Sequence, residues 1–176
     1  MDRINPARGR VAVEKRMVRT EITDYLRDRG IEYELLEHGD DALTSEKAAE
    51  LRDVPLAEML KSMVFLDDDR EVVVAVVPAE RNVDLGSLRA IADIDSLKFA
   101  DEEVIESDLG YTIGAIPPFF PGRDCPIYMD SDVLRNDEVN FSSGRPDAGI
   151  EVEIRAFRKV MDEFDAERGA IGTTPD

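Results

Sequence analysis

The most regular run of apolar residues lies between positions 61 and 77. Two apolar segments, Lys61–Leu66 and Glu71–Val77, are joined by Asp-Asp-Asp-Arg, a sequence typical of a tight turn. From residue 72 to residue 77 every side chain is apolar, so both faces of this segment favour burial. The pattern predicts a β-hairpin whose second strand lies in the centre of a sheet that is covered on both sides.

Helical periodicity precedes the hairpin. Apolar side chains in residues 14–29 recur at spacings of three and four, which predicts a helix, and Gly30 stands where a C-terminal cap belongs. Apolar residues then alternate with glutamates over 31–35, as in a half-buried strand. A second helix is expected over 44–52, where a Thr-Ser pair supplies the N-cap. A third is expected over 55–60, opened by a proline.

Shorter segments follow the hairpin and alternate between helical and extended patterns. Short capped helices are predicted over 84–91 and 101–108, and a final helix over 155–167. Short strands are predicted over 96–100, 126–129, 138–142 and 150–154. These elements show no internal repeat and no linker, so the chain is expected to form a single α+β domain around a mixed, mostly antiparallel sheet.

The length of 176 residues fits one domain and suffices for a sizeable core. The periodic patterns place that domain at residues 14–167. Residues 1–13 contain three arginines, a proline and a glycine, and they are expected to form a flexible basic arm. Residues 168–176 are expected to form a flexible tail.

The charge is strongly acidic, with 40 Asp and Glu against 22 Lys and Arg, a net charge of −18. Only five of the basic residues are lysines, and the acidic residues are dispersed along the chain. This composition favours adaptation to a salt-rich solvent over an acidic surface with its own function. It does not exclude a polyanionic partner, because at ~1 M salt charges are screened beyond about 3 Å.

Several classes of site are excluded or disfavoured. A single cysteine, Cys125, allows no intramolecular disulfide, and with the single His38 it makes a zinc site implausible. Cys125 lies between Asp124 and Pro126, without a basic neighbour to activate it, and His38 is interpreted as an ordinary surface histidine. No phosphate-binding glycine loop and no G-x-S-x-G motif occur. We therefore expect no metal and no cofactor.

Nothing in the sequence approaches the roughly 18 consecutive apolar residues of a membrane span. The first ten residues contain arginines but no apolar run after them, which argues against a secretory signal. The sequence therefore predicts a soluble cytoplasmic protein that does not bind a membrane.

The segment Gly110–Gly122 combines three prolines, three glycines, three aromatic residues and two isoleucines, without a charged residue. Its prolines cannot lie inside a regular helix or a central strand, and its glycines let another molecule approach the backbone closely. One interpretation is a rigid pocket wall that offers backbone groups to a small ligand. The other is a buried connector that the prolines stiffen.

Lys61 stands where a predicted helix meets an apolar strand, in the sequence Met-Leu-Lys-Ser-Met-Val-Phe. Its ammonium must either extend outward to solvent or line a polar cavity. At the mouth of a pocket it could orient a carbonyl or a phosphate through three donors. Position alone favours neither alternative.

These features stand in a characteristic order along the chain. The motifs are Thr-Ser-Glu-Lys-Ala-Ala at 44–49, Leu-Lys-Ser-Met-Val-Phe at 60–65, the strand 73–78 with Arg-Asn-Val-Asp-Leu at 81–85, the glycine-to-proline loop 110–119 with its G-x-x-x-P spacing, Asp130, and Asn140–Gly144. In this order, the chain from residue 30 to about residue 158 resembles the YbaK/aminoacyl-tRNA synthetase-associated domain family. Its members are free-standing relatives of the editing domain inserted in bacterial prolyl-tRNA synthetases. The turn at 140–144 has one residue more than the family pattern, and the N-terminal arm lies outside the resemblance.

The resemblance implies a partly barrel-like sheet surrounded by helices. It also implies that Lys61 is the essential lysine, in contact with the phosphate of the terminal adenosine or with the ester. Gly114 would offer backbone groups to the aminoacyl moiety or to the attacking water. The substrate-binding positions that the resemblance implies are Ile113, Ala115, Ile116, Pro117, Pro118, Asp130, Ser143 and Gly144.

Family members hydrolyse the ester that joins a wrongly attached amino acid to tRNA, without a metal. The resemblance therefore implies a trans-acting aminoacyl-tRNA deacylase that takes a small amino acid such as alanine, cysteine, serine or threonine. Its partners would be the 3′ end of aminoacyl-tRNA and, in addition, an aminoacyl-tRNA synthetase. The alternative is a non-catalytic module of the same fold that binds tRNA ends or aminoacyl-nucleotides. Size selection by such a pocket would supply only about 1–3 kcal/mol per methylene.

Overall fold

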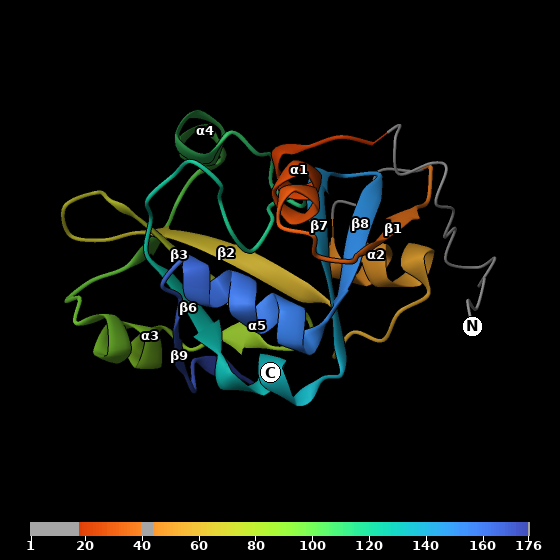
Figure 1. The fold of residues 1–176 in the computed structure, drawn as a ribbon. Coiled ribbons are helices and arrows are strands. Elements are labelled where there is room, and N and C mark those ends of the chain that lie inside the picture. Colours follow the sequence, from red (N-terminus) through yellow and green to blue (C-terminus); the bar gives the residue numbers. More distant parts are fainter. Residues whose placement is uncertain (1–17, 40–43, 176) are drawn as a thin grey trace.

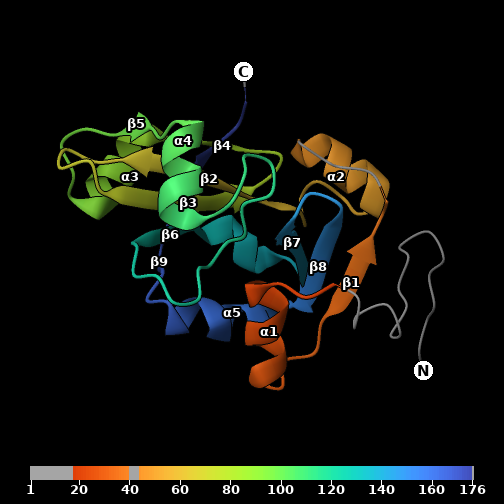
Figure 2. The same cartoon turned by 90° about the horizontal axis from the view of Figure 1, so that it is seen from above.

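The computed structural model describes residues 18–39 and 44–175. Two sheets stand next to each other in Figure 1, one of five strands and one of three. Figure 2 shows the same arrangement from above, with helices α1 and α5 together on one side of the molecule. The expected single α+β domain is confirmed. Both sheets are open, and neither closes into a barrel.

The larger sheet has the strand order β5-β2-β3-β6-β9. Its strands are β2 (Leu60–Leu66), β3 (Val72–Pro78), β5 (Lys98–Phe99), β6 (Ile127–Asp130) and β9 (Glu167–Gly169). The predicted hairpin is confirmed, because β2 and β3 pair antiparallel from Leu60↔Pro78 to Leu66↔Val72. All seven residues of β3 are buried, as its unbroken apolar run indicates. β6 and β9 add to the sheet in parallel, so this sheet is mixed.

The smaller sheet is antiparallel throughout, with the order β1-β8-β7. Its strands are β1 (Glu34–Glu37), β7 (Glu138–Arg145) and β8 (Ala148–Glu153). The register of β7 against β8 shifts between Ser142 and Arg145. A separate two-stranded pair joins β4 (Asn82–Val83) to β10 (Gly172–Thr173).

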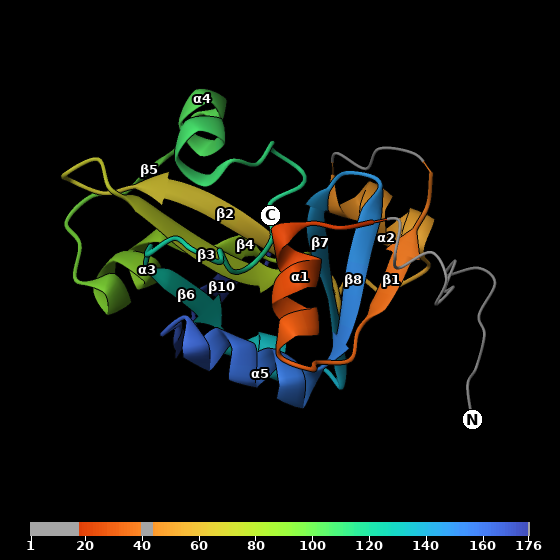
Figure 3. The same ribbon diagram turned by 45° about the horizontal axis from the view of Figure 1, so that its top comes forward.

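Helices cover both sheets (Figure 3). They are α1 (Glu21–Asp28), α2 (Ser45–Arg52), α3 (Leu85–Ala92), α4 (Glu102–Val104) with the π-helical turn η3 (Ile105–Leu109), the 3-10 turn η4 (Ser131–Arg135) and α5 (Ile154–Glu163). None of the helices in the described part of the chain has the length and apolarity to cross a bilayer.

The main core fills the space between the two sheets. Val64 and Val74 of the larger sheet share one apolar cluster with Phe141 and Ile150 of the smaller sheet, and α1 and α5 contribute to it. On the other face of the larger sheet, Leu88 of α3 packs in a second cluster. A third, smaller cluster joins α2 to the outer face of the three-stranded sheet. α2 is therefore held in place by few apolar side chains, and it carries residues of the site described below.

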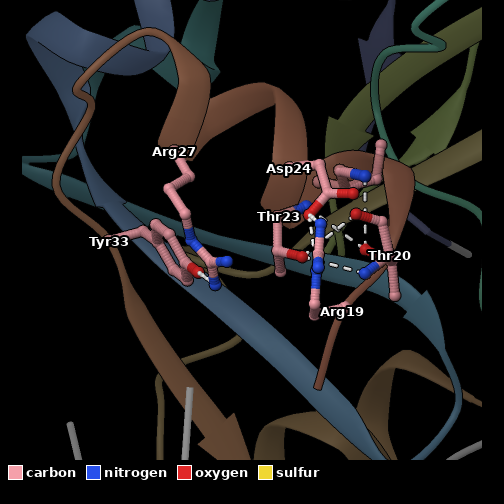
Figure 4. Close-up of polar contacts among 7 residues, drawn as sticks. Arg19, Thr20, Thr23, Asp24, Arg27 and Tyr33 are labelled. Atoms are coloured by element: carbon pink, nitrogen blue, oxygen red, sulfur yellow. Dashed lines mark hydrogen bonds and ion pairs between the residues drawn. The ribbon is translucent and has the colours of Figure 1, made fainter. Parts of the chain in front are cut away.

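Helix α1 begins later than the periodicity predicts. Val18 to Thr20 are not helical, and the first expected turn, residues 14–17, lies outside the described residues. Thr20 forms a capping box with Thr23, in which each hydroxyl accepts a hydrogen bond from the other residue's main-chain N–H (Figure 4). Gly30 follows the helix with φ +67°, so the predicted glycine stop is confirmed.

Two further expectations are wrong. Residues 55–60 form no third helix. The N–H groups of Glu58 and Met59 both bond to Pro55 O, which makes a single turn, and the chain then enters β2 at Leu60. The tail expected to be flexible instead contains β9 and β10. Its main chain pairs with β6 and β4, a contact between distant parts of the chain that no local pattern reports. The expected arm 1–13 lies outside the described residues.

Candidate functional site

A cavity of about 290 Å³ opens between α2, the first half of β2, the segment after β5, η3 and the Gly110–Gly122 loop. Its walls are mostly apolar. The residues that line it are Thr44, Ser45, Ala48, Arg52, Met59, Leu60, Lys61, Ser62, Met63, Val64, Phe99, Ala100, Ile105, Ile113, Gly114, Ile116 and Ser142. Four of the ten residues predicted for the site therefore meet in one cavity: Lys61, Gly114, Ile113 and Ile116.

Lys61 is the second residue of β2 and is half-buried. Its Nζ lies 3.4 Å from Oδ1 of Asn82 on β4. Burial lowers the pKa of the Lys61 ammonium, and the negative charge of Glu46 opposes that shift. The lowered pKa reports an ammonium that is partly withdrawn from water, where its charge acts more strongly on a bound ligand.

Gly114 occupies the third position of a tight turn at the cavity. The N–H of Ala115 donates a 3.0 Å hydrogen bond to Thr112 O, which closes the turn. Gly114 has φ +92°, a value that favours glycine. Ile113 is 49% exposed beside it, whereas Ile116 is partly buried and packs against the main core. The turn therefore presents exposed backbone at Gly114 and an apolar wall on both sides of it.

One hydrogen bond ties this loop to the strand that carries the lysine. Ser62 Oγ donates to Pro117 O at 2.9 Å. Beyond Pro118 the loop turns inward, and Phe119 and Phe120 are fully buried. The first half of the loop therefore lines a cavity, and its second half is a buried connector. Whether the first half binds a ligand stays a prediction.

Six of the predicted positions do not line the cavity in the described structure. They are Ala115, Pro117, Pro118, Asp130, Ser143 and Gly144. Ala115 and the two prolines lie buried in the loop that the cavity borders. The other three have contacts elsewhere in the molecule.

Asp130 ends β6 and is 2% exposed. Its Oδ1 accepts hydrogen bonds of 3.1 Å from the N–H groups of Ile171 and Gly172. The side chain therefore holds the C-terminal segment against the larger sheet.

Ser143 and Gly144 lie at the irregularity of β7. Ser143 Oγ donates to Ala148 O at 2.7 Å and accepts from Arg145 N–H at 3.2 Å. A Cβ on Gly144 would lie 2.9 Å from Cε1 of Tyr111, so the glycine makes room for that ring. Both residues shape the β7–β8 connection.

Sequence reasoning missed several residues of the site, of which Arg52, Phe99 and Ser142 are chemically the most distinctive. Arg52 had a detectable signal, because it lies four residues after Ala48 on the buried face of α2, where a cation is unexpected. Phe99 is 61% exposed, and its ring lies 4.8 Å from that of Phe65. Phe99 falls within the strand predicted over 96–100, but nothing in that short segment indicated that its ring would line the cavity.

The remaining candidates for nucleophilic or metal chemistry lie outside the cavity. Burial raises the pKa of the Cys125 thiol to about 11, and the charge of Asp124 acts in the same direction. His38 follows β1 and is half-buried, with its main-chain N–H 3.2 Å from Asp147 O. Within the described residues no three His, Cys, Asp or Glu side chains gather in a metal-binding arrangement.

Comparison with known proteins gives similarities in sequence and in fold. YwhH of Bacillus subtilis (strain 168), an uncharacterized protein, is 27% identical over 135 residues, which are 77% of this chain and 83% of that protein. The proline–tRNA ligase of Thermosipho africanus (strain TCF52B) is 36% identical over 75 residues, or 43% of this chain, and the match spans 13% of the ligase.

A solved structure described as "a putative trans-editing enzyme for prolyl tRNA synthetase" superposes with a TM-score of 0.75 at 21% identity. The superposition covers 93% of this chain and 99% of the other. The model of the aminoacyl-tRNA editing domain family matches residues 40–160, a range that contains α2, β2 with Lys61, and the Gly114 loop. The chain belongs to the aminoacyl-tRNA editing domain family.

Proposed function

We propose that this protein is a trans-acting deacylase that hydrolyses the ester of mischarged aminoacyl-tRNA carrying a small amino acid. The observation that carries the proposal is the meeting of Lys61, Gly114 and an apolar wall in one cavity of about 290 Å³. A cavity of this size suits a small aminoacyl group rather than a macromolecule. Membership of the editing-domain family and the described activity of the structural relative support the same reaction.

The 3′ end of the tRNA would lie at the mouth of the cavity. Phe99 and Ile113 are the large apolar side chains that the described residues expose most, and both line this cavity. Exposed aromatic rings stack on nucleic-acid bases at about 1–3 kcal/mol per base. The terminal adenine stacks on Phe99 in this proposal, and the Lys61 ammonium contacts the phosphate or the ester oxygen of the same nucleotide.

Water attacks the ester carbonyl carbon and forms a tetrahedral oxyanion. The bond from the carbonyl carbon to the ribose oxygen then breaks, the ribose oxygen leaves as a hydroxyl with a proton from the attacking water, and the free amino acid departs. The Gly114 N–H does not close its own turn, so it can donate to the oxyanion. An aminoacyl ester is already activated, so positioning and charge stabilisation can suffice.

Deacylation assays with purified protein test the proposal. tRNA charged with alanine, cysteine, serine or threonine is incubated at high salt, and ester loss is compared with the spontaneous rate. The proposal requires faster hydrolysis of at least one of these esters. Binding of the tRNA 3′ end without accelerated hydrolysis would overturn the enzyme assignment and favour a binding module. A prolyl-tRNA synthetase is the partner to test first, because the proline–tRNA ligase of Thermosipho africanus shares sequence with this chain.

A further inference from the structure

Arg52, the last residue of α2, is buried in the wall of the cavity and is only 3% exposed. Its guanidinium lies against the main chain of Gly149 on β8. A Cβ on that glycine would lie 2.3 Å from Cζ and 2.5 Å from Nε of the arginine, so any larger residue would displace the side chain. The guanidinium can therefore pack directly against the main chain only because residue 149 is a glycine.

Only some of the hydrogen-bond donors of this guanidinium have acceptors. Nη1 donates to Oδ1 of Asn140 at 2.9 Å and lies 3.6 Å from Sδ of Met59. The buried Nε has no hydrogen-bond acceptor in the described structure, and neither has Nδ2 of Asn140. No ion pair to Arg52 occurs among the described residues. Burial without a compensating charge lowers the pKa of this guanidinium to about 10.

Such an arrangement is costly to the isolated fold. A buried charge without a partner is destabilising, and an apolar side chain of similar volume at the same place is often neutral or stabilising. Arginine presents planar donors that match a carboxylate or another oxygen acceptor. Arg52 lines the cavity, so an acceptor that a ligand brings there would give this charge a partner that the fold does not supply.

We propose that Arg52 binds an oxygen on the side chain of the substrate's amino acid. The preferred substrates are esters of small amino acids that carry a hydroxyl or a carboxylate, as seryl, threonyl and aspartyl groups do, over alanyl and cysteinyl groups. This inference rests on the proposed function and narrows its substrate class. Arg52 is a specificity-determining residue in it, and Asn140 fixes the orientation of the guanidinium.

The burial of Arg52 argues against a role in binding the tRNA backbone. Phe99 and Lys61 line the exposed part of the same cavity and can meet the terminal nucleotide, whereas a guanidinium that is 3% exposed can contact only a group that enters the cavity. The aminoacyl side chain is the part of the substrate small enough to do so.

Binding measurements with non-hydrolysable analogues test this inference without requiring turnover. The probes are 3′-amino-3′-deoxyadenosine acylated on its amino group with serine, threonine, aspartate, alanine or cysteine, and affinity is measured by calorimetry. The wild-type protein should bind at least one oxygen-bearing probe about 10- to 100-fold more tightly than the alanyl probe, the range expected for a hydrogen bond to a charged donor. Separate serine, threonine and aspartate arms show whether the acceptor is a hydroxyl or a carboxylate.

Arg52→Met keeps much of the side-chain volume and removes the donors. In this variant the difference in affinity between the oxygen-bearing probes and the alanyl probe should shrink to within about threefold. The oxygen-bearing probes lose their hydrogen bond to the guanidinium, whereas the alanyl probe loses no contact. Arg52→Lys should recover part of it by charge alone. Arg155→Met is the control, since Arg155 lies on the exposed face of α5 and should leave every affinity unchanged. Thermal melting of each variant identifies any that fails to fold.

Two results would overturn the inference. One is a wild-type protein that binds alanyl and seryl probes equally. The other is a folded Arg52→Met variant that keeps the full preference. Failure of the proposed function gives a different pattern, in which the probes bind with the expected ranking but no charged tRNA is deacylated. The two failures are therefore distinguishable.

Discussion

The hydroxyl of Ser62 donates a 2.9 Å hydrogen bond to the main-chain carbonyl of Pro117. Ser62 adjoins Lys61 in β2, and Pro117 lies three residues after Gly114. This bond therefore links the strand that carries the ammonium to the loop that carries the glycine turn. Catalysis by positioning is sensitive to such a distance, because a displacement of about 1 Å can cost about 100-fold in rate.

Removing this bond should reduce both activity and stability. Ser62→Ala leaves the Pro117 carbonyl without its donor, and we expect a loss of about 1–3 kcal/mol in the free energy of unfolding. The value of kcat/KM should fall about 10- to 100-fold, since the loop can move away from Lys61. Ser107→Ala removes a comparable bond to Val104 O on an exposed surface, and it should leave activity unchanged. Equal activity losses in both variants would contradict the role of Ser62.

Lys61→Ala should abolish deacylation and leave the fold intact, because the side chain lines the cavity and is only half-buried. The loss in kcat should reach about 100-fold or more, as for the removal of one donor to a developing oxyanion. Lys61→Arg should also be poor, because a planar guanidinium does not replace a compact ammonium. Lys159→Ala, on the exposed face of α5, is the matched control. Near-wild-type rates in Lys61→Ala would remove the lysine from the mechanism.

Ile116→Ala should enlarge the cavity at its loop wall. Side chains longer by one or two methylenes should then be accepted, and relative kcat/KM should shift about 10- to 200-fold in their favour. Because Ile116 also packs against the main core, the free energy of unfolding should fall, by less than the ~2–5 kcal/mol of a fully buried isoleucine. Ile91→Ala, which packs on the far face of the larger sheet, serves as a control for lost stability. An unchanged substrate ranking would mean that Ile116 acts only in packing.

Cys125 should play no part in the reaction. With its pKa raised to about 11 by burial, only about one thiol in a thousand is ionised at pH 8. The protein should therefore react slowly with iodoacetamide at that pH, and Cys125→Ala should retain its rate of deacylation. Rapid alkylation that stops deacylation would show instead that an activated thiolate takes part.

The net charge of −18 should make stability depend on salt. Self-repulsion of the acidic surface is screened at ~1 M salt and acts over about 30 Å at ~0.01 M, so the melting temperature should fall as salt is removed. Thermal melting in potassium chloride at several concentrations measures this. A flat melting temperature would contradict adaptation to a salt-rich solvent, and it would leave the proposed deacylase activity unaffected.

The sequence was most informative where a local pattern determines structure. The hairpin of β2 and β3, the Thr44 cap of α2 and the Asp84 cap of α3 all follow from residues close together in the chain. The cavity was predictable only through Lys61 and the glycine loop, because each has an unusual local composition.

The remaining site residues depend on contacts between distant segments. Arg52 is a detectable cation on the buried face of α2, but the residue that accommodates its guanidinium, Gly149, lies 97 positions later in the chain. Asp130 carried a carboxylate that fitted a binding role, but its partners are main-chain groups of Ile171 and Gly172. The sequence around either residue gives no indication of such partners.

The parallel pairing of β9 with β6 has a consequence for aggregation. Without β9, the backbone groups of β6 from Tyr128 to Asp130 would form an open edge of the larger sheet, and an open edge can pair with another molecule. β9 is only three residues long and carries the charged residues Glu167 and Arg168, so it is itself a poor edge for another chain to pair with. β9 thus covers this edge of the sheet, and a chain cut before Glu167 would leave β6 open to pairing with another molecule.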